Sequence, residues 1–193
     1  SVLSEGHLAG LPKTSTVAEV EPGVIRKRGR AALCPRDGLP GAAYVDCVRS
    51  GDGAGLANLM VSYHSEYRME DLVECLVEHC RSTGLRPEAT WAWMCCFCVN
   101  QHRVGEMAKP AASPSQKRLK RAFGERVLGV GRLLAVIAPW RDPTFNRRSW
   151  CVFELYTALD LGAEVCHVDA AMPPREAAAW REALRSGDDA AIE

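Results

Sequence analysis

The sequence predicts an α/β fold in which helices cover both faces of a parallel sheet. Two observations predict it. Short apolar runs without polar alternation, typical of strands buried on both faces, occur four times between residues 56 and 168. Segments with helical spacing of apolar residues separate these runs. The order βαβαβαβα that results is typical of a parallel sheet.

The first strand is expected over 56–63, where only Asn58 and Ser62 interrupt the apolar run before Tyr63. A helix follows from Met69, because apolar residues recur at helical spacing on one face, and Thr83-Gly84 ends it. That face is made of Met69, Leu72, Val73, Leu76, Val77 and Cys80. The second strand is expected over 90–98.

The second half repeats the alternation. A loop is expected over 105–116 and a helix over 117–130, with Leu119, Phe123, Val127 and Val130 inward. The clearest strand of the chain covers 132–139. A helix over 149–161 stops at Gly162, a strand covers 163–168, and Pro173-Pro174 opens a last helix that reaches about residue 185.

Residues 1–55 differ in composition from this domain, which covers 56–193. They hold four Pro and nine Gly, and no helical or strand period is sustained. We expect an extended, irregular N-terminal arm that lies on its own domain or on a partner. A solvated linker is the alternative.

Composition excludes several classes of protein. The 24 basic and 24 acidic side chains cancel, so general attraction to nucleic acid or to anionic membranes is not expected. No run approaches 18 apolar residues, so no transmembrane segment is expected, although peripheral association stays open. The nine Cys are an odd number and several are adjacent, which favours a reducing, intracellular setting with buried free thiols.

Two basic clusters are candidate surfaces for other protein subunits. The first lies in the arm, and the second lies in the expected helix 117–130. Specific nucleic-acid binding is not expected, because the second cluster lacks interleaved aromatic residues. Eight acidic and three basic residues from Asp160 onward make a complementary tail. The clusters are Arg26, Lys27, Arg28 and Arg30, and Lys117, Arg118, Lys120 and Arg121.

A ligand cleft is expected beyond the carboxyl ends of the strands, as in other parallel sheets. Neither a dinucleotide fingerprint nor a P-loop occurs in the sequence. The residues that follow the strands, together with the start of the helix over 149–161, supply the candidate cleft residues. They are Ser62, Tyr63, His64, Asn100, Trp140 and Trp150.

Glu154 is the candidate catalytic residue. On its helix it lies next to Trp150, Cys151 and Ala158, so its carboxyl group is expected to be partly desolvated with a raised pKa. Such a group serves as a general acid or base, or holds a sugar hydroxyl. The alternative is a carboxylate that favours the helix N-terminus or pairs with Arg147, Arg148 or Arg103.

The run around Cys96, Cys98 and His102 contains soft metal ligands, and a zinc site is a weaker alternative there. No Cys-x-x-Cys pair anchors such a site. Buried thiols explain these cysteines as well, so no metal is assigned.

Three stretches together resemble a known family. Val61-Ser62-Tyr63 ends the first strand, residues 97–102 read Phe-Cys-Val-Asn-Gln-His, and residues 148–155 read Arg-Ser-Trp-Cys-Val-Phe-Glu-Leu. In this order they resemble the Toll/interleukin-1 receptor (TIR) domain, and most closely the TIR-like domains of algal and dinoflagellate proteins. The resemblance covers about residues 56–170.

The resemblance implies a flavodoxin-like three-layer sandwich with strand order 2-1-3-4. Some TIR domains hydrolyse NAD with a glutamate that corresponds to Glu154, whereas others serve only as interaction modules. This chain departs from the family pattern at His64-Ser65, where Arg-Trp is usual, and at Cys95, where an aspartate is usual. Loss of these supporting groups weakens a site.

We therefore expect a catalytically degenerate interaction module that needs no cofactor, an accessory subunit held in a larger assembly by its arm. An NAD hydrolase that uses Glu154, with NAD as substrate, is the alternative. The compartment is expected to be intracellular, either cytoplasm or an organelle. A plastid is compatible with the absence of a first Met.

Overall fold

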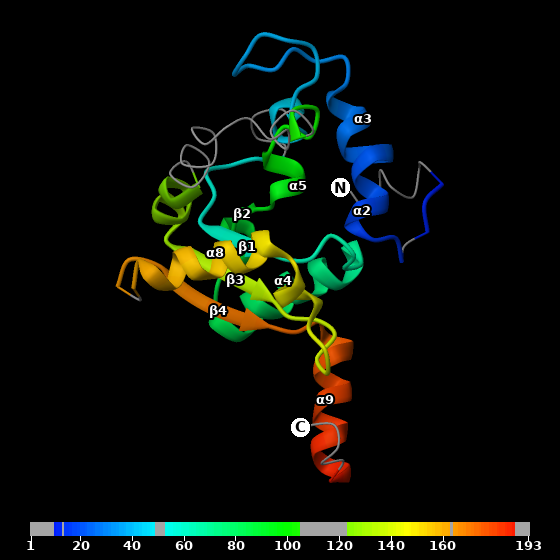
Figure 1. Ribbon diagram of the computed structural model, residues 1–193, viewed down its shortest axis with the longest axis vertical. Coiled ribbons are helices and arrows are strands. Elements are labelled where there is room, and N and C mark those ends of the chain that lie inside the picture. The colour runs from blue at the N-terminus through cyan, green and yellow to red at the C-terminus, as the bar shows by residue number, and fades with distance from the viewer. Residues whose placement is uncertain (1–9, 13, 49–52, 105–122, 163, 188–193) are drawn as a thin grey trace.

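The computed structural model describes residues 10–12, 14–48, 53–104, 123–162 and 164–187 (Figure 1). A four-stranded sheet, parallel throughout, lies at the centre of the molecule, in the order β2-β1-β3-β4. The expected α/β fold and strand order are confirmed, and the arrangement is flavodoxin-like. The strands are β1 (Leu59–Ser62), β2 (Ala92–Trp93), β3 (Arg132–Val136) and β4 (His167–Ala171).

The two faces of the sheet carry separate apolar cores, because successive strand residues point to opposite sides. Leu59 and Val61 of β1 belong to the core that includes Leu72 and Cys75 of α4 (Met69–Thr83). Met60, between them, belongs to the core of α8 (Ser149–Asp160) and the helical stretch 123–130. Helices on both faces make the three layers that the sequence predicts.

The main helices begin and end close to the expected residues. α4 stops at Gly84, whose φ of 70° is the left-handed conformation that glycine adopts readily. α9 (Pro174–Ser186) begins at the second proline, packs beside α4 and extends away from the body of the molecule (Figure 1). The buried face of α4 is rotated from the predicted one, because Val73 and Val77 are exposed while Cys75 and His79 are buried.

Two strand predictions are wrong in extent. The strand expected over 90–98 is reduced to β2, and Cys95–Cys98 form the short helix α5 instead. The amides of Phe97 and Cys98 donate to the carbonyl of Met94, which closes a helical turn where a strand would need a partner. β4 begins at His167 rather than at 163, because the amides of Val165 and Cys166 turn back onto Gly162.

Short 3₁₀ turns complete the connections, at Val45–Cys47 (η2), Pro87–Ala89 (η3) and Thr144–Arg147 (η4). Of the expected helix over 117–130, residues 123–130 are helical, with Phe123 and Val127 buried. Leu119 and the loop expected over 105–116 lie outside the described residues.

The N-terminal segment is not the extended arm that was expected. Residues 17–29 form consecutive helical turns: α2 (Val17–Val20), the π-helix η1 (Glu21–Ile25) and α3 (Arg26–Gly29). Thr16 and Glu19 cap the first turn through a reciprocal capping box. The segment lies on its own domain, because its buried aliphatic residues join the core of β1 and α4. They are Val17, Val20, Val24 and Ile25.

No helix of the described residues is both long enough and apolar enough to cross a membrane.

Candidate functional site

Glu154 lies at the carboxyl edge of the sheet, where the first turns of α8 meet the end of β1. Its residue is only 3% exposed, and the Ser62 hydroxyl donates a hydrogen bond to its carboxylate. Ser62 is the last residue of β1 and is itself fully buried. Two of the predicted cleft residues are therefore brought together, although they are 92 positions apart in the chain.

Burial raises the pKa of the Glu154 carboxyl from 4.5 to about 7, whereas the Ser62 hydrogen bond and the charge of Arg148 oppose the rise. The carboxyl group is thus poised between its two protonation states near neutral pH. The prediction of a desolvated carboxyl group is confirmed. Of the three arginines considered as partners, Arg147 pairs with Asp142 and Arg103 with Asp37.

The remaining arginine, Arg148, fixes α8 to the end of β1. Its guanidinium donates to the carbonyl oxygen of Tyr63 at 2.9 Å. The Cys151 thiol donates to the same carbonyl at 3.2 Å, and burial raises the pKa of this thiol to about 11. Cys151 therefore serves as a neutral donor, and the geometry of Glu154 depends on these two contacts. No pattern in the sequence indicates this role for Cys151.

The side chain of Tyr63 is also buried, and its hydroxyl lies 3.3 Å from the Cys95 sulfur and accepts from the Cys96 amide at 3.2 Å. Burial raises the pKa of the Tyr63 hydroxyl well above 10 and also raises the pKa of the Cys95 thiol. Cys95 is the residue at which the TIR resemblance leads us to expect an aspartate. The group that faces Tyr63 is therefore an uncharged thiol near neutral pH.

His64 continues the same edge and is half-buried. Its Nδ1 accepts from the Glu66 amide at 3.2 Å, and its ring centroid lies 5.9 Å from that of Tyr67. Burial, followed by the charge of Arg148, lowers the pKa of the imidazole. A neutral histidine is thus the form favoured beside Arg148.

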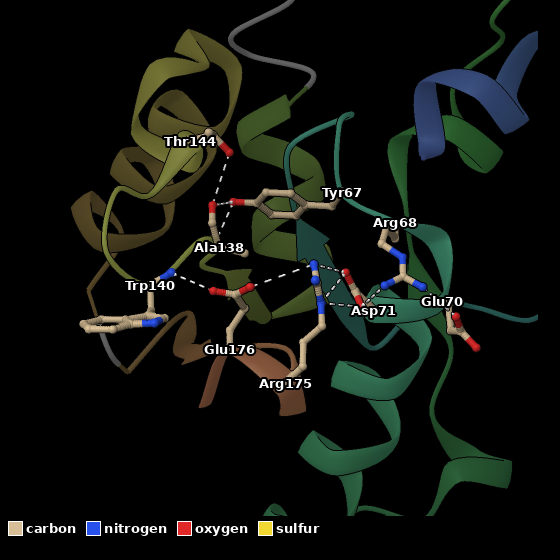
Figure 2. A network of polar contacts seen from close by, with 9 residues as sticks. All are labelled: Tyr67, Arg68, Glu70, Asp71, Ala138, Trp140, Thr144, Arg175 and Glu176. Carbon is tan, nitrogen blue, oxygen red and sulfur yellow. Dashed lines mark hydrogen bonds and ion pairs between the residues drawn. The ribbon is translucent and has the colours of Figure 1, made fainter. Parts of the chain in front are cut away.

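Trp140 is held in a polar network that joins the chain after β3 to α9 (Figure 2). Its backbone amide donates to Glu176 of α9 at 3.0 Å, and its indole points away from that network. The Arg175 guanidinium in α9 binds the buried Asp71 of α4 at 2.8 Å. Figure 2 therefore shows Trp140 as part of the link between the β3 edge and α9.

In the same network the Tyr67 hydroxyl donates to the Ala138 carbonyl at 2.6 Å and accepts from the Ala138 amide at 3.0 Å (Figure 2). The Thr144 hydroxyl donates to that carbonyl as well, at 3.2 Å. These bonds hold the chain that leaves β3, and they satisfy backbone groups that would otherwise be buried without partners.

Asn100 binds the N-terminal segment, whereas the Trp150 side chain hydrogen-bonds Glu154 and opposes the rise in the pKa of its carboxyl. The Asn100 side-chain amide donates to the Gly41 carbonyl at 2.8 Å, so it binds the N-terminal segment. Trp150 packs against Phe123 and Phe153, with ring centroids 5.5 and 5.8 Å away, and belongs to the core beneath α8.

The zinc alternative finds no support. Cys96 is buried in the apolar core, and the His102 ring lies against Gly41 with its Nε2 3.0 Å from the Arg26 carbonyl oxygen. Within the described ranges, no three His, Cys, Asp or Glu side chains are grouped so that they could hold a metal ion. All nine cysteines are free, and each is buried or half-buried.

No family model, curated protein or solved structure matches the chain. The TIR resemblance therefore remains a prediction that depends on the three sequence stretches.

Proposed function

We propose that this chain is a TIR-like interaction module that does not hydrolyse NAD and that serves as an accessory subunit in an intracellular protein assembly. The observation that carries the first part is the enclosure of Glu154. To act on a nucleotide sugar, a carboxylate must come within about 3 Å of a ribose hydroxyl. Glu154 is 97% buried, and the Ser62 hydroxyl already occupies its carboxylate.

Two positions near the end of β1, His64 and Cys95, support the same proposal. Cys95 replaces a carboxylate, and His64 has a lowered imidazole pKa. A sugar and its leaving group bind through several polar contacts that are fixed in advance, and loss of the supporting contacts reduces the rate steeply.

An exposed apolar stripe on α8 supports the interaction role. Val152, Tyr156 and Leu159 lie at i, i+4 and i+7 and are 45%, 63% and 60% exposed. Between Ser149 and Leu159 the only charged residue is the buried Glu154. In a two-fold interface the same surface of each copy meets the other, so an exposed charge on it would face a like charge. This stripe has no exposed charge and can therefore pack against a second copy of itself. We propose a second copy of this chain as its first partner.

The exposed basic residues of the N-terminal segment offer a second surface, directed to acidic protein subunits. Lys27 and Arg30 are exposed on and beside α3, and Arg26 pairs with Glu21 at 2.5 Å. Arg28 lies over the Tyr44 ring. The second basic cluster, Lys117, Arg118, Lys120 and Arg121, lies outside the described residues. The nine free cysteines agree with the reducing compartment, cytoplasmic or organellar, in which we place the assembly.

Two measurements test the proposal. Purified protein is incubated with NAD, and nicotinamide release is followed by chromatography: wild type and Glu154→Gln should match the buffer blank. Light scattering across a concentration series should show self-association of the wild type that Tyr156→Lys abolishes. Val77→Lys is the matched control, because Val77 is 59% exposed on α4, on the opposite face of the sheet. A wild type that stays monomeric, or that loses association equally in both variants, contradicts the interaction role.

NAD hydrolysis is the second candidate function, and one observation favours it. The Glu154 carboxyl has a pKa raised to about 7 at the carboxyl edge of a parallel sheet, where ligands bind in this architecture. Nicotinamide release that disappears in Glu154→Gln but persists in Glu88→Gln would establish this activity and overturn the first proposal. Glu88 is an exposed glutamate of η3 and serves as the matched control.

A further inference from the structure

A hollow lies away from Glu154, between the N-terminal segment, the β2 edge and the helical stretch 123–130. Its volume is about 1280 Å³. That exceeds the ~300–1,000 Å³ of ordinary small-molecule pockets, so a ligand of nucleotide size would occupy only part of it. Neither Glu154 nor Ser62 lines this hollow.

The charged residues that line the hollow are all basic. They are Arg28, Arg36 and Arg126, which come from three separate parts of the chain, and no described Asp or Glu lines it. In a chain whose net charge is zero, this is a local concentration of positive charge. Arg36 pairs with Asp46, whereas Arg126 makes no ion pair with any described residue. Arg126 is therefore the side chain best placed to receive an anion.

The pKa values of two thiols that line the hollow, Cys98 and Cys47, also respond to these arginine charges. Burial raises the pKa of the Cys98 thiol, and the charges of Arg126 and Arg36 both oppose that rise. Burial and the charge of Asp46, the partner of Arg36, raise the pKa of the Cys47 thiol, and the charge of Arg28 opposes the rise. The charges of Arg36 and Arg126 therefore both act on the Cys98 thiol.

Aromatic rings form the walls beside these arginines. The Arg126 guanidinium lies 5.8 Å from the Trp93 ring centroid, and Arg28 lies 5.4 Å from that of Tyr44. Stacking holds a guanidinium through its flat face, while its in-plane N–H groups are the donors that bind phosphate in pairs.

Trp91 adds a further flat surface to the hollow. Its indole lies against the backbone of Gly55, where a Cβ would come within 2.6 Å of the ring. The ring thus packs closely on a position, also in the wall of the hollow, that only glycine can fill. A fixed indole beside guanidinium groups offers a stacking surface for a planar base.

We propose that this hollow binds a nucleotide, with the phosphate groups on Arg126 and Arg36 and the base against the indole of Trp91. Neither the arginines nor the aromatic walls alone would indicate a nucleotide as the ligand. An inorganic anion would leave the aromatic walls unused, and an uncharged aromatic molecule would leave Arg126 without a counter-charge among the described residues. A nucleotide carries both groups on one molecule, and the concave shape fits a small ligand better than a protein surface.

Calorimetric titration of the full chain with ADP tests the proposal, with adenosine and pyrophosphate as the two half-ligands. We expect one ADP site, with each half-ligand binding about tenfold weaker or worse. Arg126→Gln should weaken ADP binding at least about tenfold, because it removes a charge-assisted pair of hydrogen bonds. Arg141→Gln is the matched control and should leave binding within about twofold. Arg141 lies 4.9 Å from the Trp140 ring centroid, outside the hollow.

Thermal unfolding of each variant checks that the fold is intact, and Trp91→Phe provides a second variant that keeps a ring in place. Its expected result is weaker binding of ADP with pyrophosphate binding unchanged. Glu154→Gln should keep ADP binding, which separates this hollow from the alternative NAD site.

Four outcomes would overturn the proposal. They are no ADP binding at about 5 mM, equal binding by Arg126→Gln and wild type, pyrophosphate binding as tightly as ADP, and loss of ADP binding in Glu154→Gln alone. Binding of a single-stranded oligonucleotide that ADP does not displace would also overturn it, by assigning the hollow to nucleic acid.

Discussion

Replacing Glu154 by Gln tests whether the carboxyl group is as strongly desolvated as its position indicates. Gln keeps the size of the side chain and an oxygen that accepts from Ser62, but it carries no charge at any pH. Because the folded pKa of Glu154 lies above the ordinary value, the folded protein binds the proton more tightly than the unfolded chain does. The folded state therefore loses stability as pH rises from the unfolded pKa through the folded pKa.

The structure fixes the size of this effect. The pKa of the carboxyl rises from 4.5 to about 7, and each pKa unit corresponds to about 1.4 kcal/mol. At pH 8 the wild type should therefore be less stable than Glu154→Gln by about 3 kcal/mol, and at pH 5 by only about 1 kcal/mol. Most of the stabilisation by Gln should appear between these two values.

Urea unfolding of both proteins at pH 5 and pH 8 measures the difference, and the pH dependence of all other groups cancels in the comparison. Glu88→Gln is the control, because Glu88 is exposed and its replacement should change little at either pH. If the advantage of Glu154→Gln over wild type were the same at both pH values, the carboxylate would not be desolvated in the folded protein. The case for a poised acid at this edge would then fail.

Three further predictions concern the N-terminal segment and the sheet. Gly29→Ala should lower the free energy of unfolding, measured in urea, by at least about 2 kcal/mol, because a Cβ there would lie 2.0 Å from the Ala42 carbonyl oxygen. The control is Gly129→Ala, in a helix where a Cβ would have nothing within 4 Å; it should raise the free energy of unfolding by about 0.5–1 kcal/mol. Asn100→Ala should cost about 1–3 kcal/mol and speed amide exchange in 17–29, since a buried carbonyl loses its donor; unchanged exchange would contradict this role. Burial lowers the pKa of His79, so its protonation opposes folding, and melting at pH 5.5 and 7.5 should show a wild type that loses more stability on acidification than His79→Gln. Equal losses would show that His79 is not desolvated.

The central strands could be predicted from the sequence because burial on both faces makes them continuously apolar. β3 and β1 are such strands, and their burial confirms the interpretation. The edge elements could not be predicted in the same way. Residues 95–98 are equally apolar, but β2 has a neighbour on one side only, and the chain satisfies its amides by turning into α5. An apolar run of four residues fits a strand or a helical turn equally well.

Contacts of the candidate site could be predicted from the sequence only where the strand order of the sheet determines which residues are neighbours. Ser62 ends β1, and Glu154 lies in the first turns of α8, the helix that follows β3. Because β1 and β3 are parallel neighbours in the sheet, both residues lie at the same edge. The position of Asn100 was wrong for a different reason. Its partner is a backbone carbonyl 59 residues earlier, in a segment that showed no period, and no local pattern encodes such a contact.

The stretch 97–102, which carries much of the TIR resemblance, has a structural use in this chain that explains its residues without a ligand. Asn100 binds the Gly41 carbonyl, and the His102 ring reaches the carbonyl of Arg26. The next residue, Arg103, pairs with Asp37 at 3.0 Å. Side-chain contacts of these three residues thus hold residues 26–41, while aliphatic residues of the N-terminal segment fill the core of β1.

Residue 56 is therefore not a physical boundary between an arm and a domain. A segment that supplies Val17 and Val24 to the central core cannot leave without exposing apolar surface from both sides. The same segment supplies Arg28 and Tyr44 to the hollow at the β2 edge. The part of the chain with the least regular sequence thus stabilises one half of the sheet and forms one wall of the proposed nucleotide site, so the fold and that site depend on the same contacts.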